Sequence, residues 1–246
     1  MMTDKQEVLQ NVVIKIAGDS GDGMQLTGNQ FTNNTAMLGI DLATFPDFPA
    51  EIRAPIGTLP GVSGYQLRFS SDRVYTPGDE CDVLVAMNAA ALKVNLSGLK
   101  KGGKIIVNED GFDSKNLRLA NYPDGINPLE DNSLEGYEVI KMDVTKMTRE
   151  ALKDFTMGMK EKDRAKNMFV LGFLYWMYNR NMENTIGFLK EKFGKKPNTN
   201  IFFARSFSFI PMVKSFNASR VILVTSILMT SYPSRLLSSR GFTPSG

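Results

Sequence analysis

The stretch from Val12 to Gly23, VVIKIAGDSGDG, constrains the fold of this chain more than any other part of it. Its first half is β-branched and mostly apolar, which is typical of a strand buried on both faces of a parallel sheet. The glycines Gly18, Gly21 and Gly23 come next, and a helical pattern then runs from Met24 to Leu38. A strand, a glycine-rich turn and a helix make the first half of a βαβ unit, so an α/β fold is expected.

This turn is also a candidate binding site. Free backbone N–H groups and the dipole of the following helix suit a phosphate or another anion. The glycine order is G-x-x-G-x-G, however, whereas the dinucleotide fingerprint is G-x-G-x-x-G. Asp19 and Asp22 also put negative charge where a pyrophosphate would lie, so NAD binding is not expected. A purely structural tight turn is an equally good interpretation. The candidate cofactor-binding residues of the turn are Gly18, Ser20, Gly21 and Gly23.

The composition excludes several kinds of chemistry. Of 246 residues, 42% are hydrophobic and 22% charged, which suits a globular protein with one sizeable core or two small ones. The single cysteine, Cys81, excludes an internal disulfide and an iron–sulfur cluster held by this chain alone. A small buried thiol is favoured there over a nucleophile. The chain has no histidine, no metal site is expected, and the lack of an apolar leader predicts a cytoplasmic protein.

Charge divides the chain near Pro197. The first 197 residues carry 24 basic and 26 acidic side chains, whereas residues 198–246 carry five basic ones, no acid and ten serines. The apolar run Val221–Met229 is shorter than the roughly 20 residues that span a bilayer. Neither nucleic-acid binding nor membrane binding is expected. We interpret residues 198–246 as a poorly structured tail, foreign to the native coding sequence and dispensable for folding of a domain at 1–197.

The first 197 residues predict a Rossmann-like, mostly parallel sheet flanked by helices, with a helical C-terminal part. Asn88 is expected to cap a helix that ends at Lys100–Gly103. Three later helices are expected: one capped by Thr148, one from Asp163 to Asn179 that is apolar on nearly every face and therefore buried, and one at Glu183–Phe193. Beyond the first strand, the expected strands are Asp41–Phe45, Val62–Phe69, Asp82–Met87, Lys104–Asn108 and Tyr137–Val144.

Two further residues are candidates for binding. Arg53 lies in a proline-rich loop, where its planar guanidinium could hold a carboxylate or a CoA phosphate. An ion pair with Glu51 is the plainer interpretation, and it is somewhat better supported. Asn88 follows a predicted parallel strand at the end where α/β proteins place ligands, although a simple helix cap is the better supported interpretation. No catalytic residue is assigned.

Four blocks in order resemble the gamma domain of the 2-oxoacid:ferredoxin oxidoreductases, closest to the N-terminal part of the 2-oxoglutarate:ferredoxin oxidoreductase alpha subunit. The blocks are IKIAGDSGDGMQLTG, FPDFPAEIRAPIGTLPGVSGYQLRFSS, CDVLVAMNAAALKVNLSGLKKGGKIIVN and KNMFVLGFLYW. The family turn more often reads G-x-G-G-Q-G. Here Ser20 and Asp22 replace the second glycine and the glutamine, which resembles the alpha-subunit branch.

The resemblance implies an enzyme that decarboxylates a 2-oxoacid oxidatively, releases an acyl-CoA and passes electrons to ferredoxin. It implies thiamine diphosphate, magnesium and iron–sulfur clusters in a complex with a beta subunit, and CoA as co-substrate. None of these cofactors is expected on this chain alone, since the thiamine domain expected after residue 197 is not there. The isolated chain is therefore predicted to be an inactive fragment.

Three alternatives remain open at this point. Gly21-Asp22-Gly23 with Asn33-Asn34 imitates a thiamine-diphosphate motif, but nine residues separate its parts and the asparagines fall within a helix. A non-catalytic assembly module would keep the fold and bind partner chains. A nucleotide-binding Rossmann protein would need an acid after the second strand, where Asp47 stands. The particular 2-oxoacid, contact with CoA and the oligomeric state are not specified by the sequence.

Overall fold

The computed structural model describes residues 11–51, 53–124, 126–156 and 158–193. Six strands form one sheet in the order β2-β3-β1-β4-β5-β6. Strand β3 runs antiparallel to both of its neighbours, and every other adjacent pair is parallel. The strands are β1 (Asn11–Asp19), β2 (Asp41–Asp47), β3 (Val62–Ser70), β4 (Cys81–Ala86), β5 (Leu99–Asn108) and β6 (Glu138–Met142). The predicted α/β fold with a mostly parallel sheet is confirmed.

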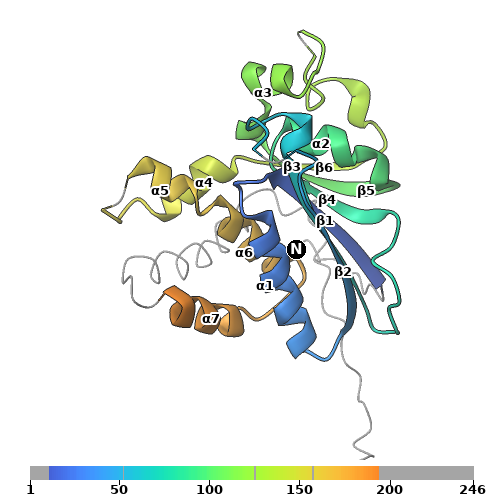
Figure 1. The fold of residues 1–246 in the computed structure, drawn as a ribbon, viewed down its shortest axis with the longest axis vertical. Coiled ribbons are helices and arrows are strands. Elements are labelled where there is room, and N and C mark those ends of the chain that lie inside the picture. Colours follow the sequence, from blue (N-terminus) through green and yellow to red (C-terminus); the bar gives the residue numbers. More distant parts are fainter. Residues whose placement is uncertain (1–10, 52, 125, 157, 194–246) are drawn as a thin grey trace, which may run out of the picture.

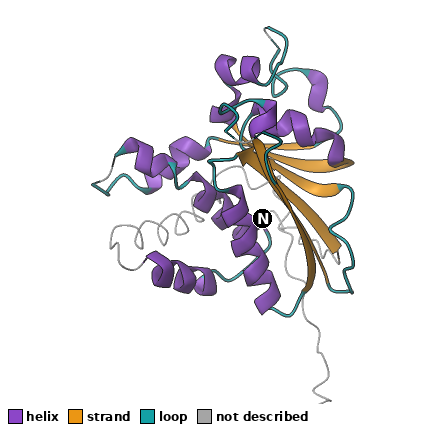
Figure 2. Ribbon diagram, viewed as in Figure 1, coloured by secondary structure: helices purple, strands orange, loops and turns teal. Residues whose placement is uncertain are grey.

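Helices cover both faces of the sheet (Figures 1 and 2). Alternate residues of β1 point to opposite faces, so Ile14 and Ile16 join the core under α1 and α6 whereas Val13 and Ala17 join the core under α2. The first strand is buried along both faces, as its apolar run predicts. The helices are α1 (Met24–Met37), α2 (Ala89–Asn95), α3 (Ser114–Leu119), α4 (Val144–Ala151), α5 (Met159–Asp163), α6 (Lys166–Met177) and α7 (Glu183–Phe193).

The connection from β2 to β3 brings a long loop to the carboxyl end of the sheet. Asp47, the last residue of β2, pairs with Gly64 of β3, and Gly64 pairs with Ala17 near the end of β1. Residues 48–61 therefore lie at the edge where β1 and β4 also end. The sequence does not reveal that β3 is antiparallel, because its apolar pattern suits either direction.

Helix α6 is the apolar centre of the core that it shares with α1. All but two of its twelve residues are buried, which confirms the burial predicted from its sequence. It ends in a Schellman motif: Asn179 has a left-handed backbone (φ 49°), its N–H donates to Trp176 O, and the Arg180 N–H donates to Tyr175 O. This ending folds the chain back so that Arg180 lies against the core.

Three predicted helix ends are wrong. Helix α2 already stops at Asn95, and Lys100–Gly103 belong to β5. There the Lys100 ammonium forms an ion pair with the carboxylate of Asp82 on β4 at 2.6 Å. Thr148 lies inside α4, because Asp143 caps that helix by accepting the Lys146 N–H. Asp163 ends the separate helix α5, so the apolar helix begins three residues later than predicted. In the first two cases a pairing partner or a local cap outweighs the hydrophobic pattern.

The remaining helix and strand predictions agree with the structure to within a few residues, including Glu183–Phe193. None of the helices within the described ranges has the length and hydrophobicity needed to cross a bilayer. The predicted tail at 198–246 and the boundary at residue 197 lie outside the described residues.

Candidate functional site

The candidate site lies where β1 and β4 end side by side. These strands are parallel, and Ala17 pairs with Ala86 in the last register position. The helix that follows β1 covers one face of the sheet, and the helix that follows β4 covers the other (Figure 1). The chain therefore switches sides between these two strands. Open α/β sheets bind ligands at such a switch point, outside the carboxyl ends of the strands.

The glycine turn at this point depends on close approach. At Gly18 an added Cβ would lie 3.0 Å from Asp22 Oδ2 and 3.1 Å from Met87 Cβ. Gly23 has φ 75° and precedes α1 as its N-cap, and an added Cβ there would lie 2.3 Å from Asn167 Nδ2. The left-handed backbone therefore favours glycine at Gly23, whereas a Cβ at Gly18 would require its neighbours to shift. Gly21 and Ser20 are exposed and face open space, which leaves the turn accessible to a ligand.

Asp19 connects three separate segments at this edge. Its Oδ1 accepts the backbone N–H of Gly57 at 2.8 Å, and its Oδ2 accepts the side-chain amide of Asn88 at 2.8 Å. The side chain is buried, and burial raises the pKa of its carboxyl, with the negative charge of Asp22 adding to the rise. The hydrogen bonds from Gly57 and Asn88 act in the opposite direction. Asp19 therefore fixes the proline-rich loop and the end of β4 to the glycine turn.

The two aspartates of the turn are thus directed inward. Asp22 Oδ2 accepts the backbone N–H of Asp19 at 3.1 Å, and the Asp22 N–H donates back to Asp19 O at 2.9 Å. The negative charge that the sequence placed in the turn is engaged in closing it. The exposed residues of the turn are Ser20 and Gly21, and the N-terminus of α1 that follows has no side-chain cap.

The plainer interpretation of Arg53, an ion pair with Glu51, is not supported among the described residues. Arg53 is exposed and has a left-handed backbone (φ 66°). Its loop is held in place at Gly57 by Asp19, and at Gly61 by a 3.2 Å bond from the Ser20 N–H. Arg53 is therefore an uncommitted cation on a loop that is fixed to the glycine turn.

Asn88 caps α2, as predicted. Its Oδ1 accepts the Ala91 N–H at 2.8 Å while its amide donates to Asp19. The side chain is buried, and both ends are engaged within the protein. Asn88 therefore supports the site by binding Asp19 and the first turn of α2. Its assignment as a direct ligand contact remains a prediction, as do those of Gly18, Ser20, Gly21, Gly23 and Arg53.

The thiamine-like motif does not fit its cofactor. Asn34 lies inside α1, and its side-chain amide donates to Asn181 O at 2.6 Å. Asp22, the acid of the G-D-G element, is bound to the Asp19 backbone. No group of three or more potential metal ligands occurs among the described residues. Diphosphate binding through a metal at this turn is therefore not supported.

Two other sequence candidates have structural roles. Cys81 is buried at the start of β4, and burial raises the pKa of its thiol to about 11, which makes it a poor nucleophile. Asp47, the acid that a ribose site would need, pairs with the buried Lys15 at 2.6 Å. Its carboxylate is engaged at the edge of the sheet, which weakens the nucleotide-binding alternative.

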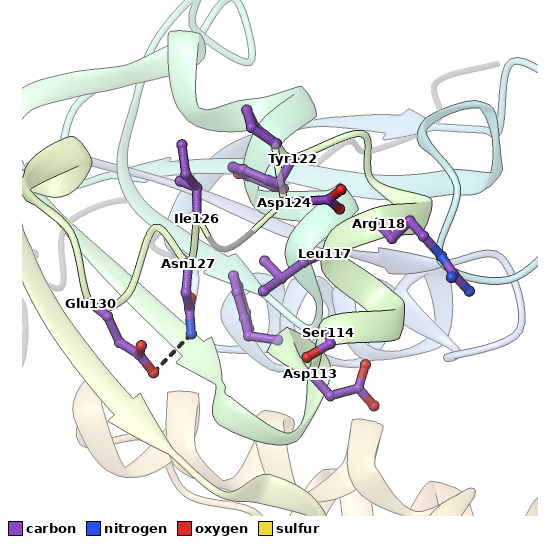
Figure 3. Close-up of a pocket in the computed structure, with 11 residues that line it drawn as sticks. Asp113, Ser114, Leu117, Arg118, Tyr122, Asp124, Ile126, Asn127 and Glu130 are labelled. Atoms are coloured by element: carbon purple, nitrogen blue, oxygen red, sulfur yellow. Dashed lines mark hydrogen bonds between the residues drawn. The ribbon is translucent and has the colours of Figure 1, made fainter.

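A pocket of about 410 Å³ lies beside α3, and Figure 3 shows its lining side chains. Asp113, Asp124 and Glu130 put three carboxylates around it, against the single guanidinium of Arg118. This balance of charge disfavours phosphate-bearing ligands. None of these residues is predicted from the sequence as a site residue, because their acidic and apolar side chains follow no recognisable spacing.

The roles of Asp19, Gly57 and Asn167 in holding the turn in place were not predicted from the sequence either. One available signal was the position of Asp19, since a charged residue at the carboxyl end of an otherwise buried parallel strand is unusual. Nothing in the sequence indicates that Gly57 or Asn167 would reach the turn, because both contacts join segments that are distant along the chain.

The chain is similar to known proteins over most of its length. Residues 13–205 match the family model for pyruvate ferredoxin/flavodoxin oxidoreductase. The 2-oxoglutarate oxidoreductase subunit KorA of Mycobacterium tuberculosis is 52% identical over 194 residues, which make up 79% of this chain and 29% of KorA. The chain thus spans less than a third of this relative's length.

Solved structures agree with this similarity. A 2-oxoglutarate:ferredoxin oxidoreductase from Magnetococcus marinus, with 2-oxoglutarate, coenzyme A and succinyl-CoA bound, matches with a TM-score of 0.64 and 27% identity, over 85% of this chain and 32% of that one. The gamma subunit of a keto/oxoacid ferredoxin oxidoreductase from Geobacter sulfurreducens matches with a TM-score of 0.54 and 17% identity, over 83% of this chain and 98% of that one. The latter likeness concerns the fold alone.

Proposed function

Because this chain belongs to the pyruvate ferredoxin/flavodoxin oxidoreductase family, we propose that it forms part of a 2-oxoglutarate:ferredoxin oxidoreductase. The identity of 52% with KorA carries this proposal, since it extends over 194 residues of the chain. The assembled enzyme would decarboxylate the 2-oxoacid oxidatively, form an acyl-CoA and reduce ferredoxin. Thiamine diphosphate, magnesium, iron–sulfur clusters and a beta subunit would be supplied by the rest of that assembly.

Within the assembly, the proposed role of this domain is to bind CoA at the glycine turn. Three features support the role: the exposed turn, the uncapped N-terminus of α1, and the uncommitted guanidinium of Arg53 on the adjoining loop. CoA carries phosphates, which both a helix N-terminus and an arginine bind well. The inward orientation of Asp19 and Asp22 reduces the electrostatic objection that the sequence raised, because both carboxylates accept backbone N–H groups.

Calorimetric titration of the chain with CoA tests this role. We expect binding of CoA, weaker binding of dephospho-CoA, and no binding of NAD. Replacing Arg53 with Ala should weaken CoA binding roughly tenfold or more, as expected for one charge-assisted contact. The matched control is Arg73→Ala, which removes another exposed arginine from a loop next to the opposite end of β3. Equal affinity of the wild type and Arg53→Ala would exclude Arg53 from the site.

The activity itself is tested by adding partners. The chain alone should oxidise no 2-oxoglutarate with CoA and an electron acceptor, because one cysteine cannot hold an iron–sulfur cluster. Co-expression with a beta subunit and a thiamine-binding domain should produce turnover. Turnover by the purified chain alone would contradict the proposal.

A second candidate role is assembly of the subunit complex without contact with CoA. Phe45 and Phe48 on β2 and just after it are 54% and 68% exposed, and Ile56 on the proline-rich loop is 76% exposed. Exposed aromatic and aliphatic side chains of this size are typical of surfaces that another chain covers. Retained partner binding together with absent CoA binding would favour this role.

A further inference from the structure

Far from the glycine turn, a half-buried arginine and a buried tyrosine lie against one aromatic ring. The Arg180 guanidinium carbon lies 5.5 Å from the centre of the Phe69 ring. Tyr178 meets the same ring edge-on, with 5.3 Å between the ring centres. Phe69 pairs with Val12 at the beginning of β1, so this cluster lies near the end of the sheet opposite the glycine turn.

Both polar groups lack hydrogen-bond partners among the described residues. The Tyr178 hydroxyl and Arg180 Nε are shielded from solvent, and neither has an acceptor or donor within reach. Tyr178 is only 3% exposed. A buried hydroxyl or guanidinium without a partner costs free energy, so native structures almost always satisfy such groups.

The nearby acid does not satisfy them. Asp82, whose charge acts on Tyr178, already accepts the Val13 N–H at 2.8 Å and the Lys100 ammonium at 2.6 Å. No carboxylate in the described part of the chain lies within ion-pair distance of Arg180. Burial lowers the pKa of Arg180, and Tyr178 and Tyr175 act in the opposite direction. The guanidinium also lies over the ring of Phe69, a contact that favours its charge.

We propose that Arg180 and Tyr178 form a binding site for one carboxylate group. The guanidinium offers a planar fork of N–H donors and the phenol an O–H donor, the set that a carboxylate oxygen pair accepts. The Schellman ending of α6 holds Arg180 in place, and the packing of Tyr178 on Phe69 holds the hydroxyl.

The carboxylate can come from this chain or from solution. Asp4 and Glu7 are the only acidic residues outside the described ranges, and both precede β1, whose second residue pairs with Phe69. A free carboxylate such as formate would present the same group. The two sources call for separate arms of one experiment on the full chain.

In the first arm, thermal unfolding is measured for Glu7→Gln and Asp4→Asn, each alone and combined with Arg180→Gln. If the chain supplies the carboxylate, one of the two lowers the unfolding temperature by roughly 3–10 °C, and that loss disappears in the Arg180→Gln background. In the second arm, sodium formate is compared with sodium chloride at equal ionic strength. If solution supplies it, formate raises the unfolding temperature of the wild type and not of Arg180→Gln.

The direction in which Tyr178→Phe changes stability is a further test, which does not depend on whether Arg180→Gln folds. Removing a hydroxyl that has no partner should leave stability unchanged or raise it, whereas removing one that donates to a carboxylate should lower it. We therefore expect a lower unfolding temperature, and retention of part of the effect by Arg180→Lys, which keeps the charge without the fork. A neutral Tyr178→Phe, with neither acid variant nor formate shifting the wild type, would overturn the proposal.

Discussion

The two ends of this sheet are built in opposite ways. At the carboxyl end, the glycine turn, the proline-rich loop and Asn88 are joined by a few polar bonds that converge on Asp19, and the turn itself faces solvent. Toward the other end, α6 covers the sheet with apolar side chains, and Phe31, Phe69, Tyr175 and Tyr178 pack ring against ring.

The difference separates stability from binding. Apolar burial under α6 covers a large area and contributes the larger share of folding free energy. The polar edge buries little apolar surface, and it presents the exposed residues Ser20 and Gly21 and the guanidinium of Arg53 to solvent. Substitutions under α6 should therefore change stability most, and substitutions at the edge should change binding with smaller effects on stability.

Leu171→Asp should have the largest effect. Leu171 is completely buried in α6, and a carboxylate there would have no partner, which costs several kcal/mol. We expect loss of folded protein in soluble expression and circular dichroism. The control is Val94→Asp on α2, where the side chain is 44% exposed and the cost should stay below about 0.5 kcal/mol. Wild-type stability of Leu171→Asp would mean that α6 does not form the core described above.

Gly23→Ala should come next. The left-handed backbone alone costs a non-glycine residue roughly 1–2 kcal/mol, and the new methyl group would displace the Asn167 side chain. The unfolding temperature should fall by roughly 2–8 °C. Gly21→Ala is the matched control, because nothing lies within 4 Å of its added Cβ and its backbone is not left-handed. Equal effects of the two substitutions would show that the turn is not held against α6.

The sequence predicts the apolar half of this comparison well and the polar half only in outline. The burial of β1 and of α6 can be predicted from the β-branched run of the strand and the mostly apolar sequence of the helix. Hydrophobic burial depends on the side-chain types at successive positions. Residue types at neighbouring positions also located the glycine turn and the Asn88 cap.

The rest could not be read in this way because it depends on tertiary contacts. Asp19 reaches Gly57 across 38 positions and Asn88 across 69, and no local pattern encodes such pairs. The antiparallel direction of β3 and the early end of α2 have the same origin, since both follow from which strand a segment finds as its neighbour. Local periodicity therefore predicted the elements, whereas the arrangement of the binding edge needed the structure.

Asp19→Asn sharpens the comparison through pH. Burial raises the pKa of the folded Asp19 carboxyl, so this group favours the folded state most when it is protonated, and that contribution falls as the pH rises above its unfolded value of about 3.9. Asparagine cannot titrate. The stability of the wild type relative to Asp19→Asn, measured by urea unfolding, should therefore be greater at pH 4 than at pH 7. A difference that stays constant or grows with pH would show that Asp19 is not the buried, proton-favouring group described above.

Arg53→Gly should have the smallest effect on stability. Glycine adopts the left-handed backbone at this position without strain, which favours the variant, but it also gains more freedom in the unfolded chain. These effects oppose each other, so the free energy of unfolding should change by less than about 1 kcal/mol. If Arg53 binds a CoA phosphate, affinity should nevertheless fall roughly tenfold or more. A large loss of stability with unchanged CoA affinity would reverse the roles assigned to the two ends of the sheet, because the polar edge would then be the part that holds the fold together.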